Sequence, residues 1–176
     1  MTTSQISYPW SEISGWKSEE FERDGFQWTR YIGPGGTEIN IADDATIGYD
    51  AHIGPGVHIG SRSSIGPGAH IGDDVTIGDG AVIGDDSYIG GDAHIGGDAT
   101  IGGGSHIGSR THIGIGAVIG SRTHIGSCVH IGDGAYIGDG ATIGHVAYIG
   151  SRARIDGGTS IGGRAYIGEG ATIDHD

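Results

Sequence analysis

Residues 77–96 read IGDGAV-IGDDSY-IGGDAH-IG, and the same six-residue unit fills most of the chain. An isoleucine stands at every sixth position from Ile41 to Ile173 without a skip, which makes 23 isoleucines in register. Glycine follows the isoleucine in 20 of these 23 units, and from Ile47 onward a small residue stands two positions before it. A period of six fits no α-helix, whose faces recur every 3.6 residues. The repeat therefore predicts short strands joined by corners.

Each unit predicts where its own side chains point. Strand side chains alternate, so the isoleucine and the small residue two before it share one face, and the residue between them points outward. Glycine, aspartate and serine after the isoleucine are turn formers. One such unit buries little apolar surface, so the units must stack into a solenoid with the isoleucines inside.

The composition excludes several classes of protein. The chain has 176 residues, 39 of them glycine but only 4 proline, which is neither collagen nor a proline-rich linker. A formal charge of −13 argues against nucleic acid or an anionic membrane surface as the main partner. The single cysteine, Cys128, excludes an internal disulfide framework. No apolar run is long enough for a membrane span. The opening MTTSQISYPW lacks a secretion signal, so we expect a cytoplasmic protein or part of an assembled particle.

The units IGDGAV (77–82), IGSRTH (119–124) and IGDGAT (137–142) follow the pattern aliphatic-Gly-X-X-small-X. In this six-residue pattern the chain resembles the hexapeptide-repeat family. The resemblance implies an all-β fold, a left-handed parallel β-helix in which three hexapeptides make one triangular coil. At 18 residues per coil, residues 41–176 give about 7.5 coils.

Residues 1–40 have a different composition. They hold all three tryptophans, both phenylalanines and the only lysine. FQWTRYI-GPGG-TEINI (26–41) predicts two strands around a turn, and SEEFERDG (18–25) predicts a short helix that ends at Gly25. Solenoid ends expose unpaired strand edges. We interpret residues 1–40 as a small N-terminal cap on the β-helix of residues 41–176, or as a docking module for a protein partner. The uncapped C-terminal coil is a second candidate contact.

Coils of 18 residues sort the outward positions into three faces, which we number from the unit of Ile41. Eight of the ten histidines fall on the first and third faces and none of these eight on the second. The first-face histidines are His58, His94, His112 and His130. The third-face histidines are His52, His70, His106 and His124. We refer to these two sets as the histidine columns.

The histidine columns have three interpretations. They are tolerated surface residues, or they mark a subunit interface or ligand groove, or they bind metal. The family resemblance implies a parallel homotrimer, in which two faces of each subunit would meet two neighbours. Carbonic anhydrases of the family hold zinc with histidines that follow the aliphatic residue, whereas these precede it. We therefore assign no metal ligand and expect no cofactor.

Most hexapeptide proteins are acyltransferases, and the resemblance implies what their catalytic residue would be here. In the family's sugar acyltransferases a histidine two residues after the aliphatic residue, as in Ile-Ala-His-Asp, is the general base. IGHVAYIG (143–150) puts His145 at that offset. A base with a pKa near neutral could deprotonate an amine or hydroxyl that attacks an acyl thioester. The donor would be acyl-CoA or an acyl carrier.

The uniform repeat favours a different function. It has no loop excursion that would wall a concave substrate pocket. We therefore expect a non-catalytic, rigid, oligomeric solenoid with a structural, interaction or ligand-sequestering role and no acyltransferase turnover. The alternative is a hexapeptide acyltransferase with His145 as general base.

Overall fold

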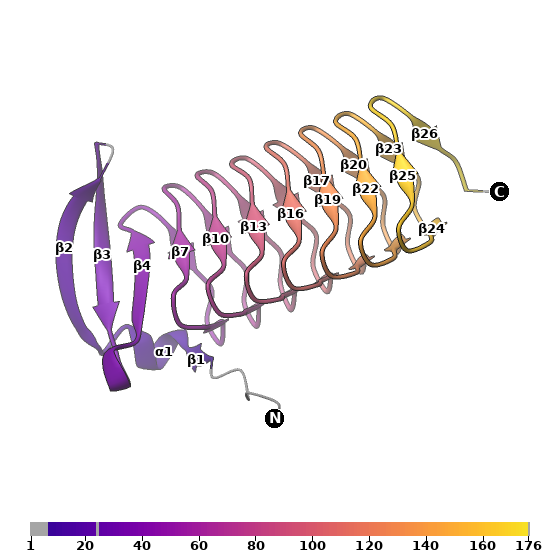
Figure 1. The fold of residues 1–176 in the computed structure, drawn as a ribbon. Coiled ribbons are helices and arrows are strands. Elements are labelled where there is room, and N and C mark those ends of the chain that lie inside the picture. The colour runs from indigo at the N-terminus through magenta and orange to yellow at the C-terminus, as the bar shows by residue number, and fades with distance from the viewer. Residues whose placement is uncertain (1–6, 24, 176) are drawn as a thin grey trace.

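The computed structural model describes residues 7–23 and 25–175, and within them the chain winds into a triangular parallel β-helix (Figure 1). Three sheets form its sides, with eight, ten and eight strands. From β4 onward the chain visits the sheets in turn, so strands of the coils that neighbour each other in a sheet are three apart in sequence order.

The bounds of the strands follow the repeat. The first-face sheet contains β2 (Lys17–Arg23), β3 (Phe26–Ile32), β4 (Glu38–Ala42), β7 (His58–Ile59), β10 (Thr76–Ile77), β13 (His94–Ile95), β16 (His112–Ile113), β19 (His130–Ile131), β22 (Tyr148–Ile149) and β25 (Tyr166–Ile167). The second-face sheet contains β5 (Thr46–Ile47), β8 (Ser64–Ile65), β11 (Val82–Ile83), β14 (Thr100–Ile101), β17 (Val118–Ile119), β20 (Tyr136–Ile137), β23 (Arg154–Ile155) and β26 (Thr172–Ile173). The third-face sheet contains β1 (Tyr8–Pro9), β6 (His52–Ile53), β9 (His70–Ile71), β12 (Tyr88–Ile89), β15 (His106–Ile107), β18 (His124–Ile125), β21 (Thr142–Ile143) and β24 (Ser160–Ile161).

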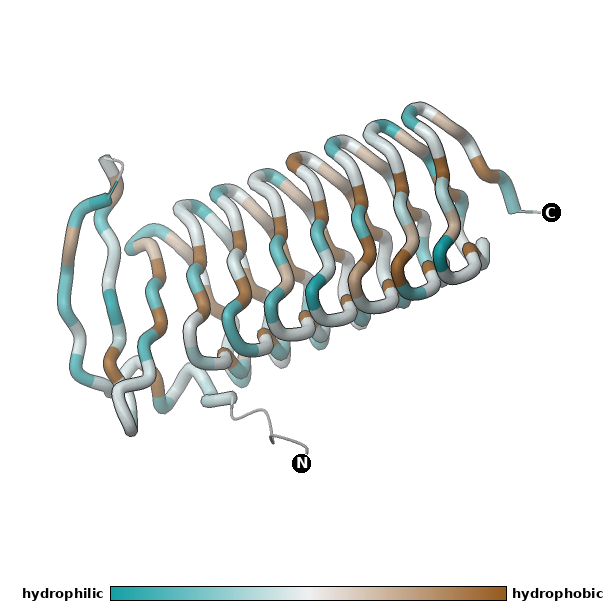
Figure 2. Tube along the Cα trace, viewed as in Figure 1, coloured by the Kyte–Doolittle hydropathy of each residue, from teal (hydrophilic) through white to brown (hydrophobic). Residues whose placement is uncertain are grey.

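The isoleucines point inward, as the repeat predicts. Each one lies beside its counterpart 18 residues away, as in the pairs Ile77↔Ile95 and Ile95↔Ile113. The in-register isoleucines from Ile53 to Ile155 are at most 1% exposed and form one continuous core, whereas Ile115, which stands outside the six-residue register, is 60% exposed. Figure 2 shows these apolar positions recurring along every coil. Most of the buried serines and threonines that replace the small apolar residue donate to a carbonyl of the next coil, as Thr111 Oγ1 does to the Gly126 oxygen at 3.0 Å, whereas the hydroxyl of Thr159 has no partner among the described residues.

Some corners share one hydrogen bond. At Asp79, Asp133, Asp139 and His145, the side chain two residues after an isoleucine accepts the backbone N–H of the residue 18 positions earlier. Asp79 Oδ1 accepts from Ser61 at 2.9 Å, and Asp139 Oδ1 accepts from Ser121 at 2.8 Å. The acidic residues at these corners therefore join one coil to the previous one, in addition to the strand ladders.

The N-terminal segment extends the first-face sheet. β3 and β4 pair antiparallel across the turn of η1 (Pro34–Gly36), so the two strands predicted around GPGG are confirmed. The helix predicted over residues 18–25 is wrong, because β2 covers Lys17–Arg23 and pairs with β3 along its whole length. Gly25, at φ +81°, belongs to a hairpin turn and does not end a helix. The sequence pair Asp24-Gly25 is a hairpin signal that the charge-rich run obscured.

The remaining N-terminal elements close the end of the core. α1 (Trp10–Ile13) buries Ile13 completely, and β1 pairs antiparallel with β6. The separation of residues 1–40 from residues 41–176 stays a prediction, and β4 spans that position while pairing with both β3 and β7. None of the helices in the described ranges is long and apolar enough to cross a membrane.

Candidate functional site

The histidine columns lie where the period predicts. The first-face histidines are on β7, β13, β16 and β19, and the third-face histidines are on β6, β9, β15 and β18. The rings stack along the solenoid in nearly parallel pairs. The centroids of His94 and His112 are 5.1 Å apart at an interplanar angle of 2°, and those of His106 and His124 are 4.9 Å apart at 10°.

Burial, and secondly the neighbouring rings, lower the pKa values of two of these histidines. The pKa of His112 lies below its ordinary value of 6.5, mainly because burial disfavours the imidazolium, and secondly because His130 and His94 would repel it. The pKa of His106 is lowered by burial and then by His124. The neutral imidazole is thus favoured at His106 and His112. Their role as a subunit interface stays a prediction.

Two column histidines have a defined tautomer. His52 Nδ1 lies 3.1 Å from the Asp50 carbonyl oxygen, and His58 Nδ1 lies 3.0 Å from that of Gly56. A carbonyl oxygen only accepts, so each Nδ1 carries the proton and each Nε2 is an acceptor. The Nε2 of His58 accepts from Asn40 Nδ2 at 3.4 Å. Within the described ranges no group of three or more histidine, cysteine or acidic side chains could hold a metal ion.

His145 occupies the corner position that aspartate holds elsewhere. Its Nδ1 accepts the Ser127 backbone N–H at 2.8 Å, as Asp139 does from Ser121 in another corner. The neutral ring therefore carries its proton on Nε2. Nε2 is then a donor, so the ring has no exposed lone pair with which to remove a proton from a substrate. The catalytic role of His145 stays a prediction, and this geometry gives the residue a structural one.

A second histidine has the catalytic offset, and the sequence reasoning missed it. His175 stands two residues after Ile173 in the run Ile-Asp-His-Asp (173–176), which matches the family's Ile-Ala-His-Asp more fully than His145 does. Its exposed ring lies beside Gly158, with Nε2 3.6 Å from the position of a Cβ there. Neither ring nitrogen has a hydrogen bond to another of the described residues, and Asp176 lies outside them. The offset rule, applied to every isoleucine, would have found it.

The repeat identifies the family of the chain. The family model "Bacterial transferase hexapeptide (six repeats)" matches residues 38–73, 58–91, 80–114 and 110–145. The chain belongs to this family. The predicted fold of this hexapeptide protein, a left-handed parallel β-helix with a small N-terminal cap, is confirmed. No curated protein sequence matches the chain.

Two solved structures show what this hexapeptide protein is similar to. The acetyltransferase domain of PglB from Neisseria gonorrhoeae FA1090 is 31% identical, with a TM-score of 0.54 over 59% of this chain and 53% of that one. The same domain in complex with acetyl coenzyme A is also 31% identical, with a TM-score of 0.53 and the same coverage. This hexapeptide protein thus spans about half the length of the solved chains that it matches.

These structures overturn the prediction of a non-catalytic structural solenoid. Both structures are of one acetyltransferase domain, and in the second it is in complex with acetyl coenzyme A. The error lay in taking a uniform coil as evidence against chemistry. In an oligomer, side chains of neighbouring subunits can form the walls of a binding site. The regular surface of one subunit therefore does not show which pockets the assembly contains.

Proposed function

We propose that this chain is an acyltransferase that moves an acyl group from a coenzyme A thioester to an amine or hydroxyl. The observation that carries the proposal is the likeness to an acetyltransferase domain in complex with acetyl coenzyme A. Family membership over residues 38–145 supports it. Acyl-CoA is a substrate here, and the chemistry needs no further cofactor.

The reaction needs one proton acceptor from the chain. A neutral imidazole takes the proton from the attacking amine or hydroxyl while the nucleophile adds to the thioester carbonyl. The resulting oxyanion collapses, the carbon–sulfur bond breaks, and the thiolate of coenzyme A leaves. The imidazolium then returns its proton to the sulfur. The products are an amide or ester and free coenzyme A, so atoms and charge balance.

His175 is the stronger candidate for this base. A general base must present an unprotonated nitrogen to the substrate. The Nδ1 of His145 accepts a backbone N–H, which leaves only a donor on its other nitrogen. Both nitrogens of His175 are free of hydrogen bonds to other described residues, and its ring is exposed. His145 is the second candidate.

The proposal includes a homotrimer whose contacts use the first and third faces. Grooves between neighbouring subunits would then supply the walls that orient donor and acceptor, and orientation is a large part of enzymatic rate enhancement. The asymmetric placement of the eight column histidines and the habit of the family support this arrangement. Light scattering at neutral pH tests it, and a mass equal to that of one chain contradicts it.

Release of free thiol from acetyl-CoA, measured with a panel of amines and amino sugars, tests the activity. We compare the wild-type chain with His175→Asn and His145→Asn. Loss of a general base slows turnover by about 10²–10⁴-fold, so we expect that loss in His175→Asn. His145→Asn should stay within a few-fold, because an asparagine oxygen can accept the same Ser127 N–H.

The two variants also separate the alternatives. If His145→Asn abolishes turnover with an unchanged melting temperature while His175→Asn does not, the base is His145. If the wild-type chain, shown to be folded, releases no thiol above background with any acceptor, the transferase proposal fails.

A further inference from the structure

The last described coil leaves three strand edges without a partner. β24, β25 and β26 are the final strands of the three sheets, and Figure 1 shows them at the open end of the solenoid. One coil earlier, the Tyr148 N–H donates to the Ala165 oxygen at 2.8 Å. The corresponding N–H groups of Ser160, Tyr166 and Thr172 have no such acceptor among the described residues. An open strand edge of this kind is a template for pairing with another strand.

The isoleucine core is also incomplete at this end. Ile161, Ile167 and Ile173 are partly exposed, whereas Ile113 in the central coils is completely buried. The edge therefore offers unpaired backbone groups and apolar side chains together. A further layer of strands would satisfy the first and remove the second from water.

The charge of this end suits a second copy of the chain. Residues 159–173 contain one cation, Arg164, and one anion, Glu169, so their net charge is zero in a chain whose formal charge is −13. The outward residues Ser160, Tyr166 and Thr172 are uncharged. Two strongly acidic chains repel each other, and an end without net charge lets them approach with little repulsion.

We propose that two copies of this chain pair tail to tail through β24, β25 and β26. A two-fold axis joins the same surface of both copies and closes the pair. The coils form a helical ramp, so β24 is the most recessed of the three strands and β26 protrudes furthest. An axis through the middle strand, β25, sets the recessed β24 against the protruding β26 of the partner subunit. All three edges then reach the strand-pairing distance of about 4.8 Å together.

This axis fixes the register of the paired strands. Tyr166 lies opposite Tyr166 of the partner subunit, and Ser160 lies opposite the partner's Thr172. The strands run antiparallel, so two residues whose open-edge N–H and C=O groups face each other exchange both hydrogen bonds. The unpaired N–H groups of the last coil thus all obtain acceptors in one arrangement.

The same register sets large side chains against small ones. Ile161 lies opposite Ala171 of the partner subunit, and Ile167 lies opposite the partner's Ala165. Interiors are close-packed, and an isoleucine facing an alanine fills the space between two coils without overpacking it. The pair therefore completes the core that the last coil leaves open.

The charged corners separate this axis from the two other axes that the triangle allows. With the axis through β25, Arg164 comes beside Glu169 of the partner subunit, and symmetry repeats the contact. An axis through β24 would bring Glu169 against the partner's Glu169, and one through β26 would bring Arg164 against the partner's Arg164. Like charges repel, so charge and ramp select the same axis. The pairing goes beyond the proposed function and does not depend on it.

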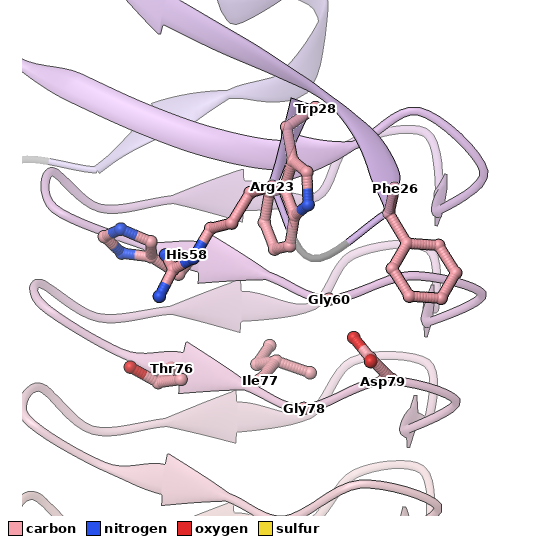
Figure 3. Close-up of a pocket in the computed structure, with 9 residues that line it drawn as sticks. All are labelled: Arg23, Phe26, Trp28, His58, Gly60, Thr76, Ile77, Gly78 and Asp79. Carbon is pink, nitrogen blue, oxygen red and sulfur yellow. The ribbon is translucent and has the colours of Figure 1, made fainter. Parts of the chain in front are cut away.

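The opposite end of the solenoid does not offer the same surface. There β3 and β2 extend the first-face sheet two strands beyond β4, whereas the second-face sheet stops at β5. Figure 3 shows Phe26 and Trp28 reaching from this hairpin toward the strands that carry His58 and Thr76. The protruding hairpin would hold the last coil of another copy away from β5. Head-to-tail filaments are therefore disfavoured, and the tail-to-tail pair closes with two copies.

Disulfide trapping in the full chain tests the pairing. The exposed Cys128 is first replaced by aspartate, which stands at the same corner position in Asp92. In that background Tyr166→Cys sets two thiols across the axis, with Cα atoms about 5.5 Å apart, a separation that a disulfide can bridge. In a glutathione redox buffer we expect a covalent dimer on a non-reducing gel. It should form about 10-fold faster than by collision, because pairing raises the effective concentration of the thiols.

Thr172→Cys and Ser160→Cys in the same background are the matched controls. Both positions are exposed and lie in the same coil as Tyr166. Each lies opposite a different residue of the partner subunit, so neither single variant should dimerise faster than by collision. The double variant Ser160→Cys/Thr172→Cys should dimerise as Tyr166→Cys does. The gel counts the chains that the disulfide joins, so contacts through other faces and transferase activity do not affect the result.

The charged corner gives a second measurement. Arg164→Glu sets carboxylates against Glu169 of the partner subunit and should slow the trapping of Tyr166→Cys about 3–10-fold. Adding Glu169→Arg should restore the rate, and Arg110→Glu, at the same corner three coils earlier, should leave it unchanged. The proposal is overturned if Tyr166→Cys dimerises no faster than by collision, if either single control matches it, or if Arg164→Glu has no effect. Circular dichroism of each variant shows that it is folded.

Discussion

The coils and the N-terminal hairpin belong to one sheet, yet they are specified in opposite ways. In the coils one six-residue rule places every side chain, and each isoleucine lies beside the next of its column. In the hairpin, Phe21, Trp28 and Arg30 form a single cluster that occurs nowhere else in the described structure. Repetition distributes stability evenly along the solenoid. The irregular hairpin instead places Phe26 and Trp28 over the first-face sheet, beside His58 and Thr76.

The largest expected effect on stability comes from placing one charge in the coils and, for comparison, one in the hairpin. Ile113 is fully buried in the central coils, and Ile113→Asp should cost several kcal/mol and unfold several coils, because the carboxylate has no partner there. Phe21→Asp on the half-buried hairpin should cost about 1 kcal/mol and leave the coils intact. Guanidinium unfolding followed by circular dichroism measures both. Equal losses in the two variants would show that hairpin and coils form one cooperative unit.

The sequence was sufficient for the coils because their period is local. A six-residue repeat names the inward position, and stacking 18 residues apart then assigns all eight column histidines to two faces. The hairpin was harder. The run of Glu19, Glu20 and Glu22 resembles a helix by propensity, whereas pairing with β3 makes it a strand. Tertiary pairing decided this segment, and the pair Asp24-Gly25 was the one local signal for it.

A smaller test concerns the close approach of successive coils. A Cβ at Gly126 would lie 2.7 Å from the backbone nitrogen of His145, so Gly126→Ala must push two coils apart. Overpacking of this kind costs about 1–3 kcal/mol. Gly162 occupies the same position two coils later, and a Cβ there would have no described atom within 4 Å. We expect Gly162→Ala to be nearly neutral in thermal unfolding. A similar melting temperature for both variants would contradict this account of the glycine.

Part of the candidate site was predictable from the sequence and part was not. The offset that selects His145 also selects His175, so both were within reach. The difference between the two histidines as candidate bases was not predictable, because it depends on the corner hydrogen bond that the Ser127 N–H donates to His145 Nδ1. That bond depends on the left-handed corner geometry of two successive coils, which no single hexapeptide reveals.

The histidine columns predict a pH dependence that the hairpin lacks. Because the pKa values of His106 and His112 are lowered in the fold, the unfolded chain binds more protons below about pH 6.5. Stability should therefore be constant above pH 7 and fall as the pH drops from 6.5 through the lowered values. Urea unfolding across pH 7.5–5 measures this slope.

The double variant His106→Thr/His112→Thr is the control for that slope. Threonine already occupies the same columns at Thr76 and Thr142, so the strands accept it. The variant should lose part of the slope between pH 6.5 and 5. If the pH dependence of the unfolding free energy is the same in the variant and the wild type, groups other than His106 and His112 cause it.

The smallest expected effect compares two corner aspartates that differ in one partner. Asp79 Oδ1 accepts the Ser61 N–H, but the residue 18 positions before Asp73 is Pro55, which has no N–H to give. Asp73 Oδ1 is accordingly buried without a hydrogen-bond partner among the described residues. Burial, followed by repulsion from Asp74 and Asp92, raises the pKa of Asp73.

The two corners should therefore respond to serine in opposite directions. Asp79→Ser removes a hydrogen-bond acceptor and should destabilise the chain by about 1 kcal/mol at pH 7. Asp73→Ser removes an unpartnered carboxylate and should stabilise the chain by about 0.5 kcal/mol, since serine already stands at this corner position in Ser109 and Ser127.

The raised pKa of Asp73 adds a second test, because the folded state binds the proton more readily than the unfolded one. The gain from Asp73→Ser should then shrink as the pH falls through that pKa, and a gain independent of pH would show that the charge of Asp73 costs nothing.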